Sequence, residues 1–339
     1  MNPLVAHLAS GDGFWTGSAM VITAMSLPHR PQSAAMTRVA GLLALIGVCF
    51  ILGSTPAAYV GFGTLITIGL IAFLAVARRD SERFTKAFRI LRIAMVVAVC
   101  AAAIIEARWA YPGPISAHMD KSFPNVHFPR MIVVGDSLSE GLGEKFPPWP
   151  DLPEMKELFE VINLAHAGDG TQLALLRIEG KLVQNAIVVI EIGGNDMLGS
   201  TSADEFEKYL DQLLANLKGE TRCLVMFELP LLPNKVAYGR IQRRLAKKYN
   251  VFLIPKLYLA NVITAKGATE DGLHLSESGT WLMARTVVHW IAPGAERNFD
   301  PNMRTLGGGL QSYPLASDAA ATSVTLTLEP PAPIPTVEP

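Results

Sequence analysis

Four short polar blocks contain the residues of this chain that can do chemistry. They are Gly135-Asp136-Ser137-Leu138, Asn163 to Gly170, Gly193-Gly194-Asn195-Asp196 and Asp271-Gly272-Leu273-His274. A serine hydroxyl becomes a good nucleophile only when a base removes its proton, and an imidazole is a suitable base. A carboxylate three residues before His274 can turn back and accept the imidazole Nδ1–H, which fixes the tautomer. These residue types indicate Ser137 as nucleophile, His274 as base and Asp271 as the group that orients the base.

Two further positions can stabilise a negatively charged oxygen. Gly168 offers a backbone N–H with no side chain in the way, and Asn195 offers a side-chain amide. With the backbone N–H of Ser137, these donors can form an oxyanion hole. The two neighbouring aspartates, Asp136 and Asp196, are expected to brace the nucleophile loop and the Asn195 loop.

Each block taken singly also has an ordinary structural explanation. Asp and Ser are common N-cap residues, so Gly-Asp-Ser is also a normal strand-to-helix turn. Gly-Gly-Asn-Asp is typical of turns, and a single histidine is more often structural than catalytic. The hydrolytic hypothesis therefore depends on all four blocks occurring together. His166 is either a pocket residue or a surface residue, and its position two residues before Gly168 leaves both interpretations open.

The blocks lie in a segment where predicted strands and helices alternate. Short apolar, partly β-branched runs predict strands, and longer periodic segments predict helices. The strands are expected at 131–134, 159–164, 186–192, 221–228 and 251–254, and the helices near 171–183, 203–218, 234–249 and 277–291. Such alternation predicts an α/β fold with a parallel sheet covered on both faces. The carboxyl ends of parallel strands meet at one edge, where ligands bind.

With these blocks in this order, residues 130–292 resemble the SGNH (GDSL) hydrolases, a family named for Ser, Gly, Asn and His in four blocks. The resemblance implies a flavodoxin-like three-layer α/β/α sandwich, with no metal and no organic cofactor. It also implies the individual roles: Ser137 as nucleophile, Gly168 and Asn195 as oxyanion donors, and Asp271 and His274 as the other triad members.

Within this family, the chain is similar to the compact bacterial periplasmic branch that has thioesterase, arylesterase and lysophospholipase activities. The similarity is carried by residues 190–196 and by Glu228-Leu229-Pro230. The first block lacks the Gly-x-Ser-x-Gly elbow of the α/β-hydrolases, so that family is a poor match.

The first 111 residues form a region of a different kind. No charged residue occurs from Val39 to Ala77, and a Ser-Thr-Pro sequence divides this run. We expect transmembrane helices near 39–54, 57–77 and 91–110, because a helix satisfies its own backbone in lipid. The moderately apolar stretch Phe14 to Leu27 is either an interfacial helix or an additional span.

Basic residues predict the orientation of this region. Six Lys or Arg side chains occur between residues 78 and 92. By the positive-inside rule this loop is cytoplasmic, and so is the amino terminus with Arg30 and Arg38. The sequence thus predicts a multi-pass membrane protein with an extracytoplasmic catalytic domain, on the periplasmic side.

The composition agrees with a membrane region joined to a globular domain, since charged residues make up 17% of the chain and the mean hydropathy is +0.30. A net charge of −1 does not indicate a nucleic-acid partner. Three cysteines cannot form a disulfide framework. We expect a linker at 112–129, the hydrolase domain at 130–293 and a Pro/Gly-rich disordered tail at 294–339.

These features predict a membrane-anchored serine esterase that acts on acyl esters or thioesters, either lysophospholipid-like or carbohydrate O-acyl. One alternative is an acyltransferase that uses the same site with a sugar or lipid acceptor. Another is a non-catalytic, tethered binding module. Several apolar residues near the blocks either receive an acyl chain or belong to the core: Leu138, Leu142, Met197, Leu198 and Leu273.

Overall fold

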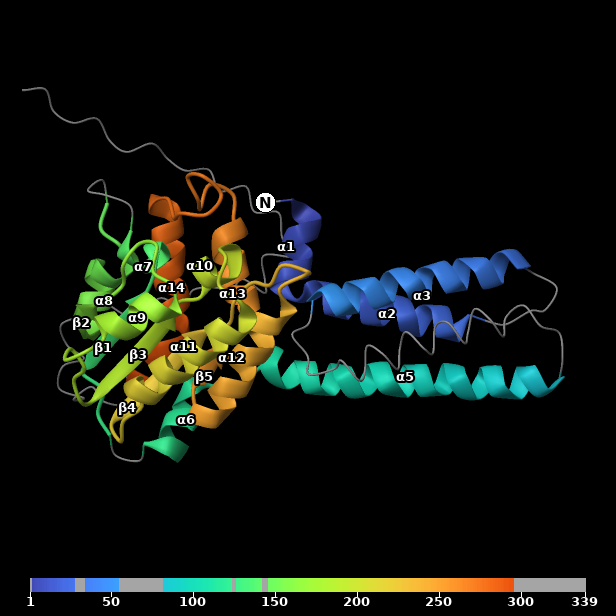
Figure 1. Ribbon diagram of the computed structural model, residues 1–339, viewed down its shortest axis with the longest axis horizontal. Helices are drawn as coiled ribbons and strands as arrows, with labels where there is room; N and C mark the ends of the chain where they lie inside the picture. Colours follow the sequence, from blue (N-terminus) through green and yellow to red (C-terminus); the bar gives the residue numbers. More distant parts are fainter. Residues whose placement is uncertain (1, 28–33, 55–81, 124–125, 142–145, 296–339) are drawn as a thin grey trace, which may run out of the picture. The chain divides into compact units, whose positions relative to one another are not determined.

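The computed structural model describes residues 2–27, 34–54, 82–123, 126–141 and 146–295 (Figure 1). The span predicted at 57–77 and nearly all of the predicted tail lie outside these residues. Leu142 and Arg30 also lie outside them.

Five parallel strands form one sheet with the order β2-β1-β3-β4-β5. This order is that of flavodoxin-like doubly wound folds. The strands are β1 Arg130–Gly135, β2 Glu160–Asn163, β3 Ala186–Glu191, β4 Arg222–Phe227 and β5 Phe252–Ile254. The predicted parallel sheet is confirmed, and each predicted strand lies within about two residues of its observed position.

Helices cover both faces of the sheet, as Figure 1 shows. One face carries α6 Ile115–Ser122, α8 Pro153–Leu158, α13 Lys256–Thr264 and α14 Glu277–Ala295. The other face carries α9 Thr171–Arg177, α11 Ala203–Leu217 and α12 Val236–Tyr249. The three-layer sandwich expected from the family resemblance is therefore confirmed.

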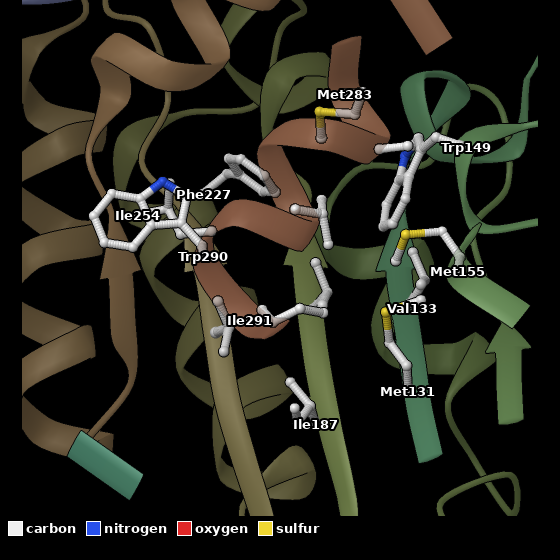
Figure 2. Close-up of a cluster of buried hydrophobic side chains, with 14 of the residues drawn as sticks. Met131, Val133, Trp149, Met155, Ile187, Phe227, Ile254, Met283, Trp290 and Ile291 are labelled. Atoms are coloured by element: carbon white, nitrogen blue, oxygen red, sulfur yellow. The ribbon is translucent and has the colours of Figure 1, made fainter. Parts of the chain in front are cut away.

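The sheet is buried on both faces because successive strand residues point to opposite sides. Met131 and Val133 of β1 pack toward α14, where they belong to the same cluster as Met283 (Figure 2). Ile132 and Val134 belong to the cluster on the other face, with residues of α11 and α12. This explains why β1 reads as a continuous apolar run.

Helix α11 shows how local sequence defines an element. Ser202 accepts the Glu205 backbone N–H, and the Glu205 carboxylate accepts the Ser202 backbone N–H, which forms a capping box. Its buried side chains recur at helical spacing: Phe206, Leu210, Leu213, Leu214 and Leu217. The cap and the apolar stripe together place this helix on the sheet.

The segment expected to be a linker, 112–129, contains helix α6. Ile115 and Met119, four residues apart, are buried in the α14-side cluster together with Phe128. The proline and histidine content suggested a linker, but the i, i+4 apolar pair makes α6 part of the hydrolase domain.

The described residues of the amino-terminal region are mostly helical. They form α1 Pro3–Ser10, α2 Asp12–Ser26, α3 Ala34–Ser54 and α5 Glu82–Ala110. Figure 1 shows α2, α3 and α5 side by side. Within the described residues, one helical stretch, Arg89–Ala110, is long and apolar enough to cross a membrane, and the apolar stretch Val39–Ser54 is shorter.

Helices α2 and α3 are antiparallel and in backbone contact. A Cβ atom on Gly17 would lie 2.4 Å from the Gly47 carbonyl oxygen, and one on Gly13 would meet Ser54. Small residues at a crossing allow this close approach. The stretch Phe14 to Leu27, for which two interpretations were open, therefore forms most of a helix packed along α3.

Candidate active site

The nucleophile candidate Ser137 lies at the carboxyl end of β1, as the first residue of the short helix α7 Ser137–Glu140. The Asp136 carboxylate caps this helix by accepting the Leu138 backbone N–H at 3.1 Å. Ser137 is 8% exposed, and its hydroxyl has no hydrogen-bond partner among the described residues. The hydroxyl is therefore available to a substrate and a base.

The oxyanion candidates Gly168 and Asn195 follow β2 and β3. Asn195 lies in α10 Gly194–Leu198, and its Nδ2 donates to the Asp169 backbone oxygen at 2.9 Å and contacts the Asp136 carboxylate at 3.4 Å. Gly168 has a φ of +82°, and a Cβ there would meet no atom within 4 Å. The structure thus brings the first three blocks together around the Asn195 amide.

Asp196 connects the segment that follows β3 to the segment that follows β2. Its buried carboxylate accepts the Thr171 backbone N–H at 2.8 Å and the Thr171 hydroxyl at 2.9 Å. A Cβ on Gly170 would lie 2.9 Å from that carboxylate, so the close approach depends on glycine. The Asn195 loop is thereby joined to the start of α9.

Sequence reasoning did not single out Asp169. Its carboxylate is buried and forms an ion pair with the Arg177 guanidinium, while its backbone carbonyl accepts from Asn195. The pair joins a loop residue to the last residue of α9, eight positions later, so no regular spacing in the sequence indicates it.

A second buried network, made of hydrogen bonds, holds the short helix that begins at Ser137. Glu191, the last residue of β3, accepts the Ser139 hydroxyl at 2.9 Å, and Ser139 accepts the Trp149 indole N–H at 3.1 Å. Burial, together with the neighbouring Asp136, raises the pKa of Glu191 well above its ordinary value. Burial also raises the pKa of Asp136 to about 6, although the Leu138 N–H acts in the opposite direction.

The base candidate His274 is held by Asp271 in the loop before α14. His274 Nδ1 lies 2.6 Å from Asp271 Oδ2. Asp271 Oδ1 accepts the backbone N–H groups of His274 at 2.8 Å and Leu273 at 2.9 Å. These hydrogen bonds hold the pKa of the Asp271 carboxyl well below its ordinary value. Gly272, with a φ of +89°, permits the tight turn between them.

A charge on His274 lowers the pKa of Asp136, the residue before Ser137. His166 lies beside Asp169, with its Nδ1 3.6 Å from the carboxylate and its side chain 48% exposed. Within the described residues, no group of three or more His, Cys, Asp or Glu side chains could hold a metal ion.

The apolar residues near the blocks divide into two groups. Leu138 and Met197 are buried in the two core clusters. Leu198 is 52% exposed and Leu273 is 38% exposed. Of the described members, only these last two leave a substantial apolar surface beside the candidate site.

Known proteins resemble this domain. The model of the GDSL-like lipase/acylhydrolase family matches residues 133–282, which contain all four blocks. Thioesterase 1/protease 1/lysophospholipase L1 of Escherichia coli K12 is 28% identical over 173 residues, which cover 48% of this chain and 83% of that protein. The arylesterase of Vibrio mimicus is 30% identical over 171 residues, which cover 45% of this chain and 84% of that protein.

Among solved structures, the crystal structure of TesA is 26% identical, with a TM-score of 0.43, and the match covers 48% of this chain and 98% of that chain. The segment that the family model matches holds Ser137, Asn195 and His274, and the two sequence relatives are matched over 83% and 84% of their own lengths. The chain belongs to the GDSL-like lipase/acylhydrolase (SGNH hydrolase) family, and it is a serine hydrolase that acts on ester bonds.

Proposed function

We propose that Ser137, His274 and Asp271 form a catalytic triad that hydrolyses acyl esters or thioesters. The observation that carries this proposal is the 2.6 Å contact between His274 Nδ1 and Asp271 Oδ2, in the segment that the family model matches together with Ser137. This contact leaves Nε2 of the imidazole free to take the serine proton, as triad chemistry requires.

In the proposed reaction, Ser137 Oγ attacks the acyl carbonyl carbon while its proton passes to His274 Nε2. The resulting oxyanion is stabilised by the N–H groups of Ser137 and Gly168 and by the Asn195 amide. Collapse of the intermediate expels the alcohol or thiol, which takes the proton from His274. Water, activated by the same imidazole, then releases the acid from the acyl-serine.

We further propose that the amino-terminal helices are a multi-pass membrane region. Arg89–Ala110 has the length and hydropathy of a span, and its exposed side chains between residues 93 and 105 are apolar, among them Ile93, Val97 and Ile104. The close contact between α2 and α3 is of the type that small residues permit between membrane helices.

The contacts in this region suggest the direction in which each helix runs. The start of α2, the end of α3 and the end of α5 all contact the hydrolase domain, through Lys256 or Arg243. At the other end of the bundle formed by α2, α3 and α5, Arg92 donates to the Leu27 carbonyl at 2.8 Å.

This arrangement changes the proposed orientation of the amino terminus. The arginines at 78–92 keep the far end of the bundle cytoplasmic by the positive-inside rule. The hydrolase domain is then extracytoplasmic, and so is α1, which contacts α13 of that domain. The prediction of a cytoplasmic amino terminus rests on Arg30 and Arg38, but α2 separates these arginines from α1 along the chain, so α1 is on the opposite side in this proposal.

The catalytic proposal is tested with the full chain in detergent and a water-soluble p-nitrophenyl ester. Ser137→Ala should lower kcat by at least about 10³-fold and abolish labelling by a fluorophosphonate. The exposed Ser200→Ala serves as a matched control and should behave as wild type. Undiminished turnover by Ser137→Ala would refute the assignment.

A further inference from the structure

Four buried charged residues join the helical region to the hydrolase domain. Arg243 of α12 donates from Nη1 and Nη2 to both Glu106 oxygens, at 2.7 and 2.8 Å. Its Nε donates to Glu228 at 2.6 Å. Lys256 Nζ lies 3.9 Å from Glu106. All four side chains are at most 8% exposed.

The members of this cluster come from distant elements. Glu106 belongs to the last turns of α5, the candidate membrane span, whereas the other three belong to the hydrolase domain. Two carboxylates face two cations in this cluster, and Asp12 of α2 lines the same cavity. Removing one member of such a buried set leaves a charge without compensation. The helical region therefore supplies a charge that the domain requires.

Other contacts around the cluster hold the same junction. Lys256 Nζ donates to the Ser54 carbonyl at the end of α3, and the Leu231 N–H donates to the Ala9 carbonyl of α1 at 3.3 Å. A Cβ on Gly11 would lie 2.5 Å from Lys256 Cε. Helices α1, α3 and α5 thus all contact segments that directly follow β4 or β5.

This junction and the candidate site occupy the same edge of the sheet. Glu228 follows β4, and Ser137 follows β1, two strands away in the order β1-β3-β4. Neighbouring strands are about 4.8 Å apart, so Ser137 lies about 10 Å along this edge from the end of β4. Tyr111, 72% exposed just after α5, is a residue type enriched at membrane interfaces.

Exposed leucines border the site on the segments that carry the catalytic blocks. Leu198 follows Asn195 by three residues, and Leu273 precedes His274. Leu173 and Leu176 of α9 are 47% and 62% exposed. Exposed apolar side chains next to a site are of the kind that can receive lipid or acyl chains.

We infer that Glu106, Arg243, Glu228 and Lys256 dock the hydrolase domain onto the end of its own membrane helices. The docking holds the Ser137 edge of the sheet at the membrane surface, where the ester groups of amphipathic acyl lipids lie. The inference rests on the proposed function and adds to it that the site takes its substrate from the bilayer that holds its own helices. The domain is fixed on the membrane region and is not a loosely tethered hydrolase.

The test compares two substrates on the full chain reconstituted in phosphatidylcholine vesicles. One is water-soluble p-nitrophenyl acetate, and the other is palmitoyl lysophosphatidylcholine held in the same vesicles. The double variant Glu106→Gln/Arg243→Gln removes one charge of each sign, so the net charge of the junction is unchanged. It should retain acetate hydrolysis and lose about tenfold or more in lysophosphatidylcholine hydrolysis, because positioning is lost.

A matched control is available one residue further along α12. Arg244 pairs with Glu207 on the exposed surface between α11 and α12, so Glu207→Gln/Arg244→Gln removes an equivalent pair away from the junction. The control should leave both activities unchanged. If the junction variant loses neither activity, or loses both by the same factor, the docking inference is wrong. A wild-type chain that does not hydrolyse the acetate ester would instead contradict the proposed function.

Discussion

The side-chain amide of Asn195 donates a hydrogen bond to the main-chain carbonyl of Asp169, with Nδ2 and O 2.9 Å apart. This bond joins the loop after β3 to the loop after β2, which are not neighbouring strands in the sheet. The Asn195 amide is therefore fixed before a substrate arrives, next to the backbone of Gly168. Fixed donors are effective in oxyanion stabilisation because they need no reorganisation during the reaction.

Replacing the Asn195 amide should affect the chemical step more than binding. We predict that Asn195→Ala lowers kcat by about 10²–10³-fold with a smaller change in KM. Steady-state kinetics with a p-nitrophenyl ester measure both quantities. Asn261→Ala, on the exposed face of α13, is the control. A kcat equal to that of wild type would show that Asn195 does not stabilise the oxyanion.

The orienting role of Asp271 can be separated from any role in stability. Its carboxylate is largely exposed but accepts three hydrogen bonds, from the imidazole and two backbone N–H groups. Asp271→Asn should lower kcat by about 10²–10⁴-fold, because the imidazole loses its preferred tautomer. Tm should change little. The neighbouring Glu270→Gln should leave kcat unchanged, and an equal loss in both variants would argue against a triad.

The buried Asp136 should make stability depend on pH. Its pKa rises from 3.8 to about 6 in the folded chain, mainly because burial disfavours the charged form. Between these values the folded state keeps a proton that the unfolded state has lost, so stability falls as the pH rises through this window. The loss is complete above about pH 6 and is on the order of 3 kcal/mol, since one pKa unit corresponds to about 1.4 kcal/mol.

Asp136→Asn removes this titration and keeps an acceptor for the Leu138 N–H. The Tm of the variant minus the Tm of wild type should therefore be larger at pH 8 than at pH 4. Thermal unfolding in detergent at the two pH values measures it. A difference that does not change with pH would show that Asp136 does not titrate in this window.

The charge cluster predicts strongly non-additive effects on stability. Glu106→Gln alone leaves Arg243 and Lys256 against the single carboxylate of Glu228, which should cost about 3–5 kcal/mol. The balanced double variant Glu106→Gln/Arg243→Gln should be more stable than the single variant. Thermal unfolding of the full chain compares the two. A double variant that is less stable than the single one would show that charge balance does not govern this junction.

The contact between α2 and α3 predicts a steric effect. Gly17→Ala places a methyl group where the Gly47 carbonyl lies, so the helices must separate, at a cost of about 1–3 kcal/mol. Gly113→Ala, where a Cβ meets nothing within 4 Å, should stay within about 0.5 kcal/mol of wild type. Equal Tm values for the two variants would contradict the described helix crossing.

The sequence by itself determined the hydrolase fold and the residues proposed for its site, because both depend on local signals. The continuous apolar run of β1 and the helical spacing in α11 each reflect burial in the sandwich. The four blocks are recognisable because turn geometry and reactive groups occur within a few consecutive residues. His274 and Asp271, for example, are only three positions apart.

The tertiary structure alone decided the contacts between distant segments. Glu106 and Arg243 are 137 residues apart, and no sequence pattern around either residue predicts that they pair. The place of α1 beside the hydrolase domain and the Asn195 bond to Asp169 likewise depend on how whole elements pack. A buried charge needs a partner of opposite sign, because desolvation of an unpaired charge costs free energy. Which residue becomes that partner depends on how distant elements pack in three dimensions. The local sequence therefore does not predict which distant residues pair.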